Sequence, residues 1–422
     1  MKTTIVLLSL LSFLTFTNKS FSQGESAVPF LTFPVSPSQT GMGATGASLP
    51  NDDPFGFLLN PAQLGHISQS TNLSFAFYPN KVKLWGFDKF TINSFAINAG
   101  YNFKELLNIP ISVGVGYADS KYLIDLPYAL QFTFEELEQF STFSFGVGID
   151  YYIQLNAGIS SKGIVSKIPD YTSSLFPPPT FEADANVIDF GFLINIPVIK
   201  LIDDQLSFEI FDKNPTKPFF DLSLGYSQLN IGDEIYYNDP LQKDPLPRTA
   251  KLGYGISTGF DFDIDNTFIR VFSIDFTVDA EDKLLEYEII NSGNPVIPNM
   301  KRFKGYQSFI GDINIGKNIF QIKGDENVIS KTGFQINVFE FFTYKQGHLS
   351  GDGYNSVKTN GFEIRSKGIL NFINAVSSIE AIKFITNCFD LRYSYSKYSI
   401  DDGVETKFHG ISIYVQNLNS LF

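Results

Sequence analysis

Apolar and polar residues alternate along most of this chain, from residue 70 to the end. Leu73, Phe75 and Phe77 alternate with Ser and Ala, and the longest series occupies every second position from Phe143 to Ile159. Successive side chains of a strand point to opposite faces, so this spacing predicts strands with one apolar face. Thirteen segments fit: 73–77, 95–103, 111–117, 143–159, 187–196, 219–228, 250–260, 268–277, 303–315, 333–343, 360–372, 388–397 and 408–415.

The second face of these strands indicates the fold class. Opposite the apolar series of 143–159, the residues are mostly small or uncharged: Ser144, Gly146, Gly148, Asp150, Tyr152, Gln154, Asn156, Gly158 and Ser160. A soluble sandwich would carry many charged residues there, whereas small polar residues suit a crowded barrel lumen with aromatic residues facing lipid. We therefore expect an all-β protein, a transmembrane antiparallel β-barrel. Bacterial barrels have even strand numbers, so the weakly patterned segment 374–386 is taken as the fourteenth strand. The alternative is a large secreted β-sandwich or β-solenoid.

Residues 1–22 have the pattern of a cleaved secretory signal peptide. Lys2 provides the positive charge, Ile5 to Phe16 is largely apolar, and Ser20-Phe21-Ser22 fits a cleavage site. The alternative is an anchoring helix, but the apolar stretch is shorter than the ~20 residues that span a bilayer. No later segment is apolar enough for such a helix. We assign residues 71–422 to an outer-membrane barrel of a Gram-negative bacterium, in contact with its lipid.

The segment between signal and barrel, residues 23–70, contains two short motifs that predict tight turns. In Asn60-Pro61-Ala62, Asn60 suits a helix N-cap and Pro61 the first helical position. Gly41 and Gly43 belong to a "GMGATG" stretch. This stretch lacks the Lys-Ser/Thr and the preceding strand of a nucleotide-binding loop, so the glycines are expected to allow close backbone packing inside the pore.

Three segments between strands are long enough to be extracellular loops, namely 119–141, 161–184 and 279–301. The chain ends in Phe422, the residue with which outer-membrane barrels usually end. The apolar residues of the last strand, Ile411, Ile413 and Val415, occupy odd positions, so an unbroken strand would place Phe422 on the opposite face. A bulge or a tail after the last strand is therefore expected.

Composition and charge exclude several classes of function. The formal net charge is −13 and becomes more negative when the signal, with its two lysines, is removed, which disfavours nucleic-acid binding. Cys388 is the only cysteine, so there is no disulfide framework and no thiolate zinc site. There are 44 Phe and 20 Tyr residues against only 18% charged residues, which suits strands that face lipid.

We found no pattern that supports catalysis or metal binding. His66, His348 and His409 are far apart in sequence, and the glycines around His348 indicate a loop. Asp261 to Asn266 resembles the start of a calcium loop, but Asn266 and Phe272 stand where an EF-hand has Gly and Glu. We predict no enzyme, no cofactor and no bound metal.

Residues 30–65, "FLTFPVSPSQTGMGATGASLPNDDPFGFLLNPAQLG", resemble the N-terminal signature of PorV/PorQ-type outer-membrane proteins of the FadL-like superfamily. The stretches "DPLPRTAKLGYGIS" (244–257) and "NVIDFGFLINIP" (186–197) are similar to further segments of that group. Leu59 and Gln63 depart from its usual pattern.

The resemblance implies a fourteen-stranded barrel with residues 23–70 folded inward as a hatch. Asn60, Pro61 and Ala62 would then fix a hatch turn, and Gly41 and Gly43 would allow it to pack closely. PorV-like members serve type IX secretion by contact with the translocon and with C-terminal signal domains of cargo. FadL-like members pass hydrophobic small molecules such as fatty acids or aromatic compounds. The residues alone do not choose between these functions. From the resemblance we favour an accessory role in type IX secretion that acts by protein–protein contact, with passive transport of hydrophobic small molecules as the alternative.

Overall fold

The computed structural model describes residues 26–70, 73–84, 87–128, 132–170, 179–211, 214–232, 234–237, 243–264, 267–290, 300–377, 384–385, 388–400 and 405–416. The predicted signal peptide and Phe422 lie outside the described residues.

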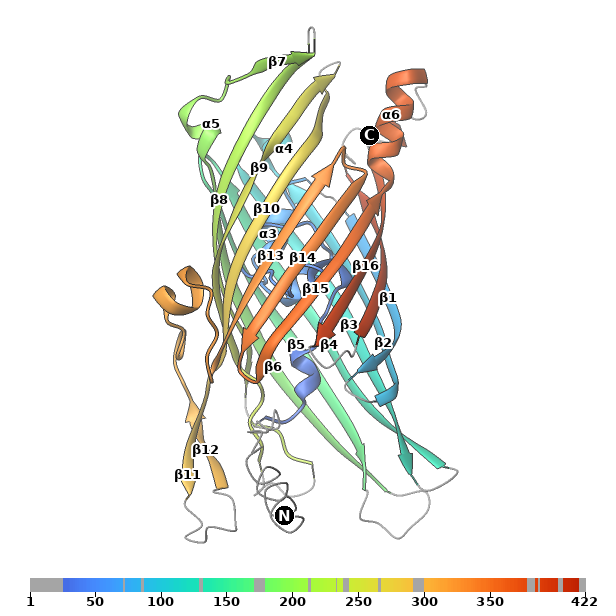
Figure 1. The fold of residues 1–422 in the computed structure, drawn as a ribbon, viewed down its shortest axis with the longest axis vertical. Helices are drawn as coiled ribbons and strands as arrows, with labels where there is room; N and C mark the ends of the chain where they lie inside the picture. Colours follow the sequence, from blue (N-terminus) through green and yellow to red (C-terminus); the bar gives the residue numbers. More distant parts are fainter. Residues whose placement is uncertain are drawn as a thin grey trace, which may run out of the picture.

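The chain forms a closed barrel of fourteen antiparallel strands (Figure 1). Each strand pairs with its sequence neighbours in the barrel, and the first strand pairs with the last through Leu73 and Val415. The strands are β1 (Leu73–Leu84), β2 (Phe87–Asn102), β3 (Ile111–Tyr128), β4 (Phe132–Asp150), β5 (Gln154–Pro169), β6 (Thr180–Pro197), β8 (Asn214–Gly232), β9 (Thr249–Ile264), β10 (Thr267–Lys283), β13 (Val328–Val338), β14 (Phe342–Gly351), β15 (Tyr354–Arg365), β16 (Phe389–Ile400) and β17 (Glu405–Val415).

Three further strands lie outside this closed ring. Strand β7 (Phe208–Phe211) pairs only with the start of β8, and β11 (Leu285–Ile290) pairs with β12 (Met300–Tyr306) in a separate hairpin. Figure 1 shows this hairpin beside the barrel, below β6 and β13.

The described helices are short. They are η1 (Pro29–Thr32), α2 (Pro37–Thr40), η2 (Gly56–Leu58), α3 (Gln63–Ile67), α4 (Lys104–Leu107), α5 (Val198–Ile202), the π-helical η4 (Ile315–Phe320) and α6 (Ser366–Ser377). None of the helices in the described ranges is long and apolar enough to cross a membrane.

The two ends of the barrel differ. At the turn end, where β1 begins and β17 ends, the connections include α4, α5 with β7, the β4–β5 turn and α6. At the opposite loop end, the connections include β3–β4, β5–β6, β8–β9 and the long β10–β13 passage that carries β11 and β12. The three segments predicted as long loops all connect strands at the loop end.

Those predicted loops are much shorter than expected, because the strands continue into them. β3 extends to Tyr128 and β4 begins at Phe132, so most of 119–141 is strand. β5 and β6 likewise cover much of 161–184, and β10 with β11 covers much of 279–301.

The outer face of the wall is apolar in its turn-end half only. On β4 the outward residues there include Phe143, which is 58% exposed, whereas the inward Ser144 is buried. The exposed apolar residues of this band, called the belt below, include Phe75, Phe77, Ile97, Val115, Phe145, Ile159, Phe192, Leu224, Tyr344, Leu391, Tyr393, Ile411 and Ile413. Nearer the loop end the same outward positions carry charged residues such as Lys397 and Glu405, which pair with each other.

The predicted single strand 143–159 is wrong, because the chain reverses between Asp150 and Gln154. These two residues pair across the hairpin, as do Ile149 and Leu155. Because three residues connect the strands, paired residues are an even number of positions apart. Residues that face outward therefore have odd numbers on both strands, and the alternation continues through the turn.

The prediction for 333–343 also crosses a turn, since β13 ends at Val338 and β14 begins at Phe342. Strand β14 was predicted as a loop because of Gly347, Gly351 and Gly353. Gly347 instead lies within the strand, where a Cβ atom would be 2.0 Å from the backbone nitrogen of Gly43. The glycine at position 347 is therefore explained by close packing against Gly43 and not by a loop.

Two further predicted strands are not in the wall. Residues 303–306 belong to the β11–β12 hairpin, and the following residues of 303–315 form no strand. Helix α6 takes up the end of 360–372 and the start of 374–386. Part of 374–386 lies outside the described residues.

Candidate functional site

The described part of the N-terminal segment, residues 26–70, is enclosed by the barrel wall and is mostly buried. Its helix α3 packs on β2, β3, β4 and β5, and α2 packs on β15, β16 and β17. The segment therefore contacts wall strands on both sides of the seam between β1 and β17. This enclosed segment and the spaces beside it form the candidate site.

Gly41 and Gly43 contact the wall at β13, β14 and β15. Gly43 has a positive φ of 74°, and a Cβ atom there would be 2.5 Å from the carbonyl oxygen of Thr332. Its N–H donates to Oγ1 of Thr359 at 2.9 Å, and that hydroxyl donates to the carbonyl oxygen of Gly41 at 3.2 Å. Glycine at position 43 meets both the conformational and the steric requirement.

Asn60, Pro61 and Ala62 contact the wall at β5 and β6. The fully buried Asn60 donates through Nδ2 to the carbonyl oxygens of Ala47 (2.6 Å) and Phe192 (3.1 Å). Its Oδ1 accepts the N–H of Ala62 at 3.0 Å. The predicted N-cap is wrong in register, since α3 begins at Gln63 and Ala62 is its N-cap. Asn60 instead closes the preceding turn and ties it to β6.

A row of glycines lies on the wall beneath this turn and α3. The row crosses five neighbouring strands in direct register, with one residue each on β2 to β6: Gly100, Gly114, Gly146, Gly158 and Gly191. A Cβ atom at any of them would come within 3 Å of Asn60, Pro61, Leu64 or Ser68. The sequence pattern placed Gly146 and Gly158 on the small inner face, but it did not indicate what they contact.

Asp279 on β10 holds the middle of the segment. One carboxylate oxygen accepts the N–H groups of Gly46 (2.8 Å) and Ala47 (3.0 Å), and the other accepts the hydroxyl of Ser48 (2.5 Å). Hydrogen bonds to an ionised group are stronger than neutral ones. No local sequence pattern marks Asp279, because its partners are more than 230 residues away.

An ionic network that is buried except at Asp52 joins the segment to β14, β15 and β16. Arg392 bonds Asp52 at 2.7 Å and Asp390 at 2.6 Å, and Lys345 bonds Ser38 and Glu363. Burial alone would raise the pKa of Asp52, but the guanidinium of Arg392 outweighs it and holds that pKa well below its usual range.

The neighbouring Asp53 behaves differently from Asp52. Burial raises its pKa, although the hydroxyl of Ser36 and the N–H of Phe55 donate to its carboxylate. The Asp52-Asp53 pair therefore has one carboxylate fixed by a cation and one held by neutral donors.

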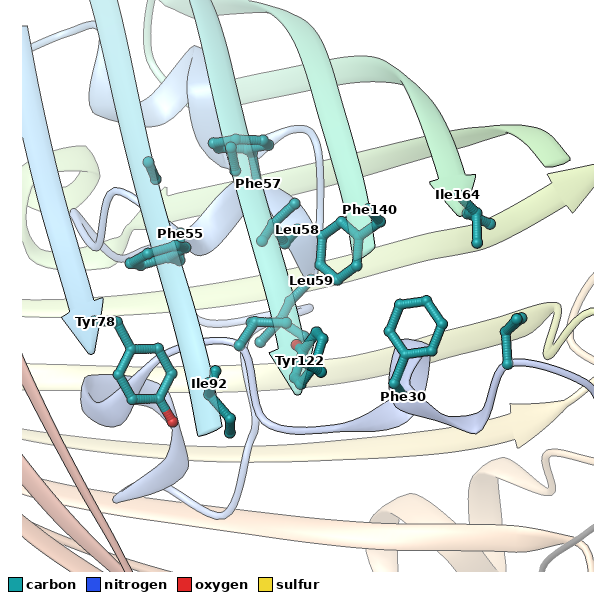
Figure 2. Packing of buried hydrophobic residues seen from close by; sticks show 14 of the residues in the cluster. Phe30, Phe55, Phe57, Leu58, Leu59, Tyr78, Ile92, Tyr122, Phe140 and Ile164 are labelled. Atoms are coloured by element: carbon teal, nitrogen blue, oxygen red, sulfur yellow. The ribbon is translucent and has the colours of Figure 1, made fainter. Parts of the chain in front are cut away.

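Aromatic residues fill the space between the segment and the first strands of the barrel (Figure 2). Phe30 and Phe55 face Tyr78, Tyr122 and Phe140 of β1, β3 and β4. The ring centroids of Phe30 and Tyr122 are 5.4 Å apart, and those of Phe30 and Phe140 are 6.2 Å apart. Phe33 packs edge-on against Phe90 and Tyr122.

A cavity of about 80 Å³ adjoins this aromatic cluster on the loop-end side of the segment. Its apolar lining includes Phe33, Phe140, Leu229, Tyr398 and Phe408, and its charged lining comprises Lys162, Lys251, Lys283, Lys331 and Glu281. We call it the loop-end cavity.

A second cavity, of about 280 Å³, lies on the turn-end side of the segment. Its lining is strongly charged and includes Asp52, Asp275, Arg270, Arg365, Lys345 and Arg392. We call it the turn-end cavity. Gln39 lines both cavities, so the segment separates an aromatic compartment from a polar one.

The three histidines lie apart and each bonds a neighbour. Their partners are Gln154 for His66 (3.0 Å), Ser356 for His348 (3.1 Å) and Tyr393 for His409 (2.6 Å). The expectation that His348 lies in a loop is wrong, because it is part of β14. Within the described residues, no three His, Cys, Asp or Glu side chains are grouped as metal ligands would be. The absence of enzyme activity stays a prediction.

The sequence matches no protein-family model and no curated protein. Solved structures similar to the barrel include the CymD monoaromatic hydrocarbon channel, with a TM-score of 0.41, 10% identity, and coverage of 90% of this chain and 97% of that one. The Ralstonia pickettii toluene transporter TbuX has a TM-score of 0.35 at 10% identity, and a Pseudomonas aeruginosa FadL homologue has 0.36 at 9%, each with the same coverage. Similarities at this level carry no argument about the ligand of this chain. The PorV/PorQ resemblance stays a prediction.

Proposed function

We propose that this protein is an outer-membrane barrel through which hydrophobic small molecules with an anionic headgroup pass without energy input. Residues 23–70 would act as the hatch that opens and closes the path. The observation that carries the proposal is the loop-end cavity, where aromatic and lysine side chains meet beside the enclosed segment.

The belt supports placement in a membrane. Outward residues such as Phe143, Phe145 and Ile411 are large, apolar and exposed, while their inward neighbours are small and polar. Outer-membrane barrels expose a continuous apolar band of this kind to lipid. The predicted signal peptide is consistent with export to the outer membrane.

The loop-end cavity has the chemistry of a site for an amphipathic anion. Lys162 pairs with Asp189 at 2.9 Å, but Lys251 and Lys331 both pair with the single carboxylate of Glu281. The other nearby carboxylate, Asp279 opposite Lys331, accepts hydrogen bonds from residues 46–48, so the two lysines share Glu281 as their ion-pair partner. Lys251, Lys331 and Glu281 are buried, and a lysine that shares its carboxylate can donate to an anionic headgroup as well.

The size of the cavity supports a hatch that must move. An engineered dry cavity of about 150 Å³ binds benzene, whereas the loop-end cavity holds only about 80 Å³. A ligand with an alkyl chain or ring therefore fits only if part of residues 26–70 shifts. The structure corresponds to a closed state under this proposal.

Uptake of labelled dodecanoate by Gram-negative cells that lack their own channel for hydrophobic compounds tests this function. We expect faster uptake with the protein than without it. Lys331→Met leaves Lys251 and Glu281 as a one-to-one pair, so uptake at low dodecanoate should fall about tenfold, the effect of losing one charged hydrogen bond of ~1.5 kcal/mol. Uptake of neutral dodecanol should change little.

Lys167→Met is the matched control, because Lys167 is a half-exposed lysine that pairs with Glu182 and does not line the cavity. It should leave uptake of both probes unchanged. Uptake that equals that of cells without the protein would overturn the proposed transport function.

A second candidate function is an accessory role in type IX secretion, with the translocon or cargo signal domains as partners. The β11–β12 hairpin favours it, because it stands outside the barrel ring at the loop end. Tyr287, Phe303 and Tyr306 form an aromatic cluster on this hairpin. Loss of cargo secretion together with unchanged dodecanoate uptake in a gene deletion would favour this role over transport.

A further inference from the structure

Short helices with exposed apolar residues occupy several connections at the turn end. Leu107 lies on α4, Ile202 ends α5 and is 81% exposed, and Ile369 on α6 is 45% exposed. Tyr151 in the β4–β5 turn is 69% exposed. Figure 1 shows α6 outside the barrel ring at this end.

Helix α6 is amphipathic. Ile369 and Ile373 are four residues apart and share one face, and both side chains are exposed. Lys367 and Asn371 are two residues from Ile369 in either direction, which places them on the opposite face at about 100° per residue. An exposed apolar face on a helix of this length is costly in water.

The start of α6 is fixed to the wall, so its orientation is defined. Oδ1 of Asp390 accepts the N–H of Lys367 at 3.2 Å, and the side chain of Lys367 bonds Glu340 at 3.1 Å. Gly368 packs on the β13–β14 turn, where a Cβ atom would be 2.4 Å from the carbonyl oxygen of Phe339. The helix is thus held against two wall elements at its first turn.

The belt is continuous with this helix. Ile364 lies just before α6 on β15, and Phe389 and Leu391 lie after it on β16, and all three are exposed on the outer face. Phe341, in the turn that α6 covers, is also exposed. Lipid that contacts the belt at these positions would also meet the apolar face of α6.

We propose that α6 lies in the membrane–water boundary at the turn end, with Ile369 and Ile373 among the acyl chains of phospholipid. Interfacial helices bury their apolar face ~5–10 Å into this boundary. The exposed tyrosines of the β4–β5 turn, at the same end of the barrel, fit this boundary because Tyr is enriched at membrane interfaces. The inference rests on the proposed membrane placement but not on what passes through the lumen.

Quenching of a single tryptophan by brominated phospholipid tests this inference. Trp85 is the only tryptophan, so Trp85→Phe provides the background, and the protein is reconstituted in phosphatidylcholine bilayers with or without bromine on the acyl chains. Ile369→Trp should lose about twofold in fluorescence in the brominated bilayer, as expected for a side chain at the acyl-chain boundary. Asn371→Trp, on the opposite face, should change little.

Two further variants separate the possible failures. Phe145→Trp lies in the belt and should be quenched, whereas Lys304→Trp, on the exposed β11–β12 hairpin, should not be. If Phe145→Trp is quenched but Ile369→Trp is not, the proposal for α6 is overturned, and a protein partner would be the better candidate to cover its apolar face. Equal quenching at positions 369 and 371 would also overturn it. Failure at position 145 would instead overturn the membrane placement itself.

Discussion

At the scale of single residues, glycine sets how closely the wall and the N-terminal segment approach. At Gly158 a Cβ atom would lie 2.2 Å from the carbonyl oxygen of Pro61, and at Gly191 it would lie 1.9 Å from Oδ1 of Asn60. Contacts this short cannot be relieved by rotating one flexible side chain, because Pro61 contributes backbone and Asn60 is fully buried. These positions are therefore where the wall is least tolerant of an added methyl group.

Gly158→Ala should destabilise the folded protein, because overpacking costs about 1–3 kcal/mol. The midpoint of heat unfolding, read from the mobility shift on a gel without boiling, should fall by several degrees. Gly163→Ala on the same strand is the control, since its nearest atom would be 3.6 Å away. Equal effects of the two substitutions would show that the segment does not pack on β5 as described.

At the scale of elements, the sequence indicated most barrel strands but not all of their ends. Strand β17 was predicted because Ile411 and Ile413, which face outward, alternate with the inward Gly410 and Ser412. The β4–β5 turn was missed because the alternation continues through it. β14 was missed because Gly347 was interpreted as part of a loop although it serves packing against Gly43.

The residues of the candidate site could be singled out from the sequence only in part. Gly41, Gly43 and Asn60 drew attention because turns and caps have local sequence patterns, and their role in a hatch stays a prediction. Asp279 and Arg392 were not, because each acts on residues hundreds of positions away, and nothing local distinguishes them from other lumen charges.

The docking of the N-terminal segment on β10 depends on Asp279. Asp279→Ala removes the acceptor for three donors of residues 46–48, so we expect faster hydrogen–deuterium exchange in a peptide covering residues 44–50. Asp275→Ala, on the same strand, is the matched control, because Asp275 bonds Ser257 and Gln335 of neighbouring strands. Faster exchange of that peptide in both variants would indicate a general loosening of β10 instead.

At the scale of the whole molecule, the barrel combines a lipid-facing belt with a lumen divided by its own N-terminal segment. The loop-end cavity is aromatic and basic, and the turn-end cavity is polar and charged. The aromatic lining of an enlarged loop-end cavity would stabilise a hydrophobic molecule, whereas the charged lining of the turn-end cavity would not. The proposed transport therefore requires that residues 26–70 move, and preventing that movement should stop it.

A reversible cross-link between the segment and the wall tests this requirement most directly. A Cβ atom at Gly41 would lie 3.3 Å from Cβ of Lys345, close to the ~3.5–4.5 Å of disulfides. Gly41→Cys with Lys345→Cys, in a Cys388→Ala background, should therefore form a disulfide, and each single variant serves as a control. Dodecanoate uptake by cells carrying the oxidised double variant should fall to that of cells without the protein, and a reducing agent should restore it. Equal uptake with and without the cross-link would contradict the account.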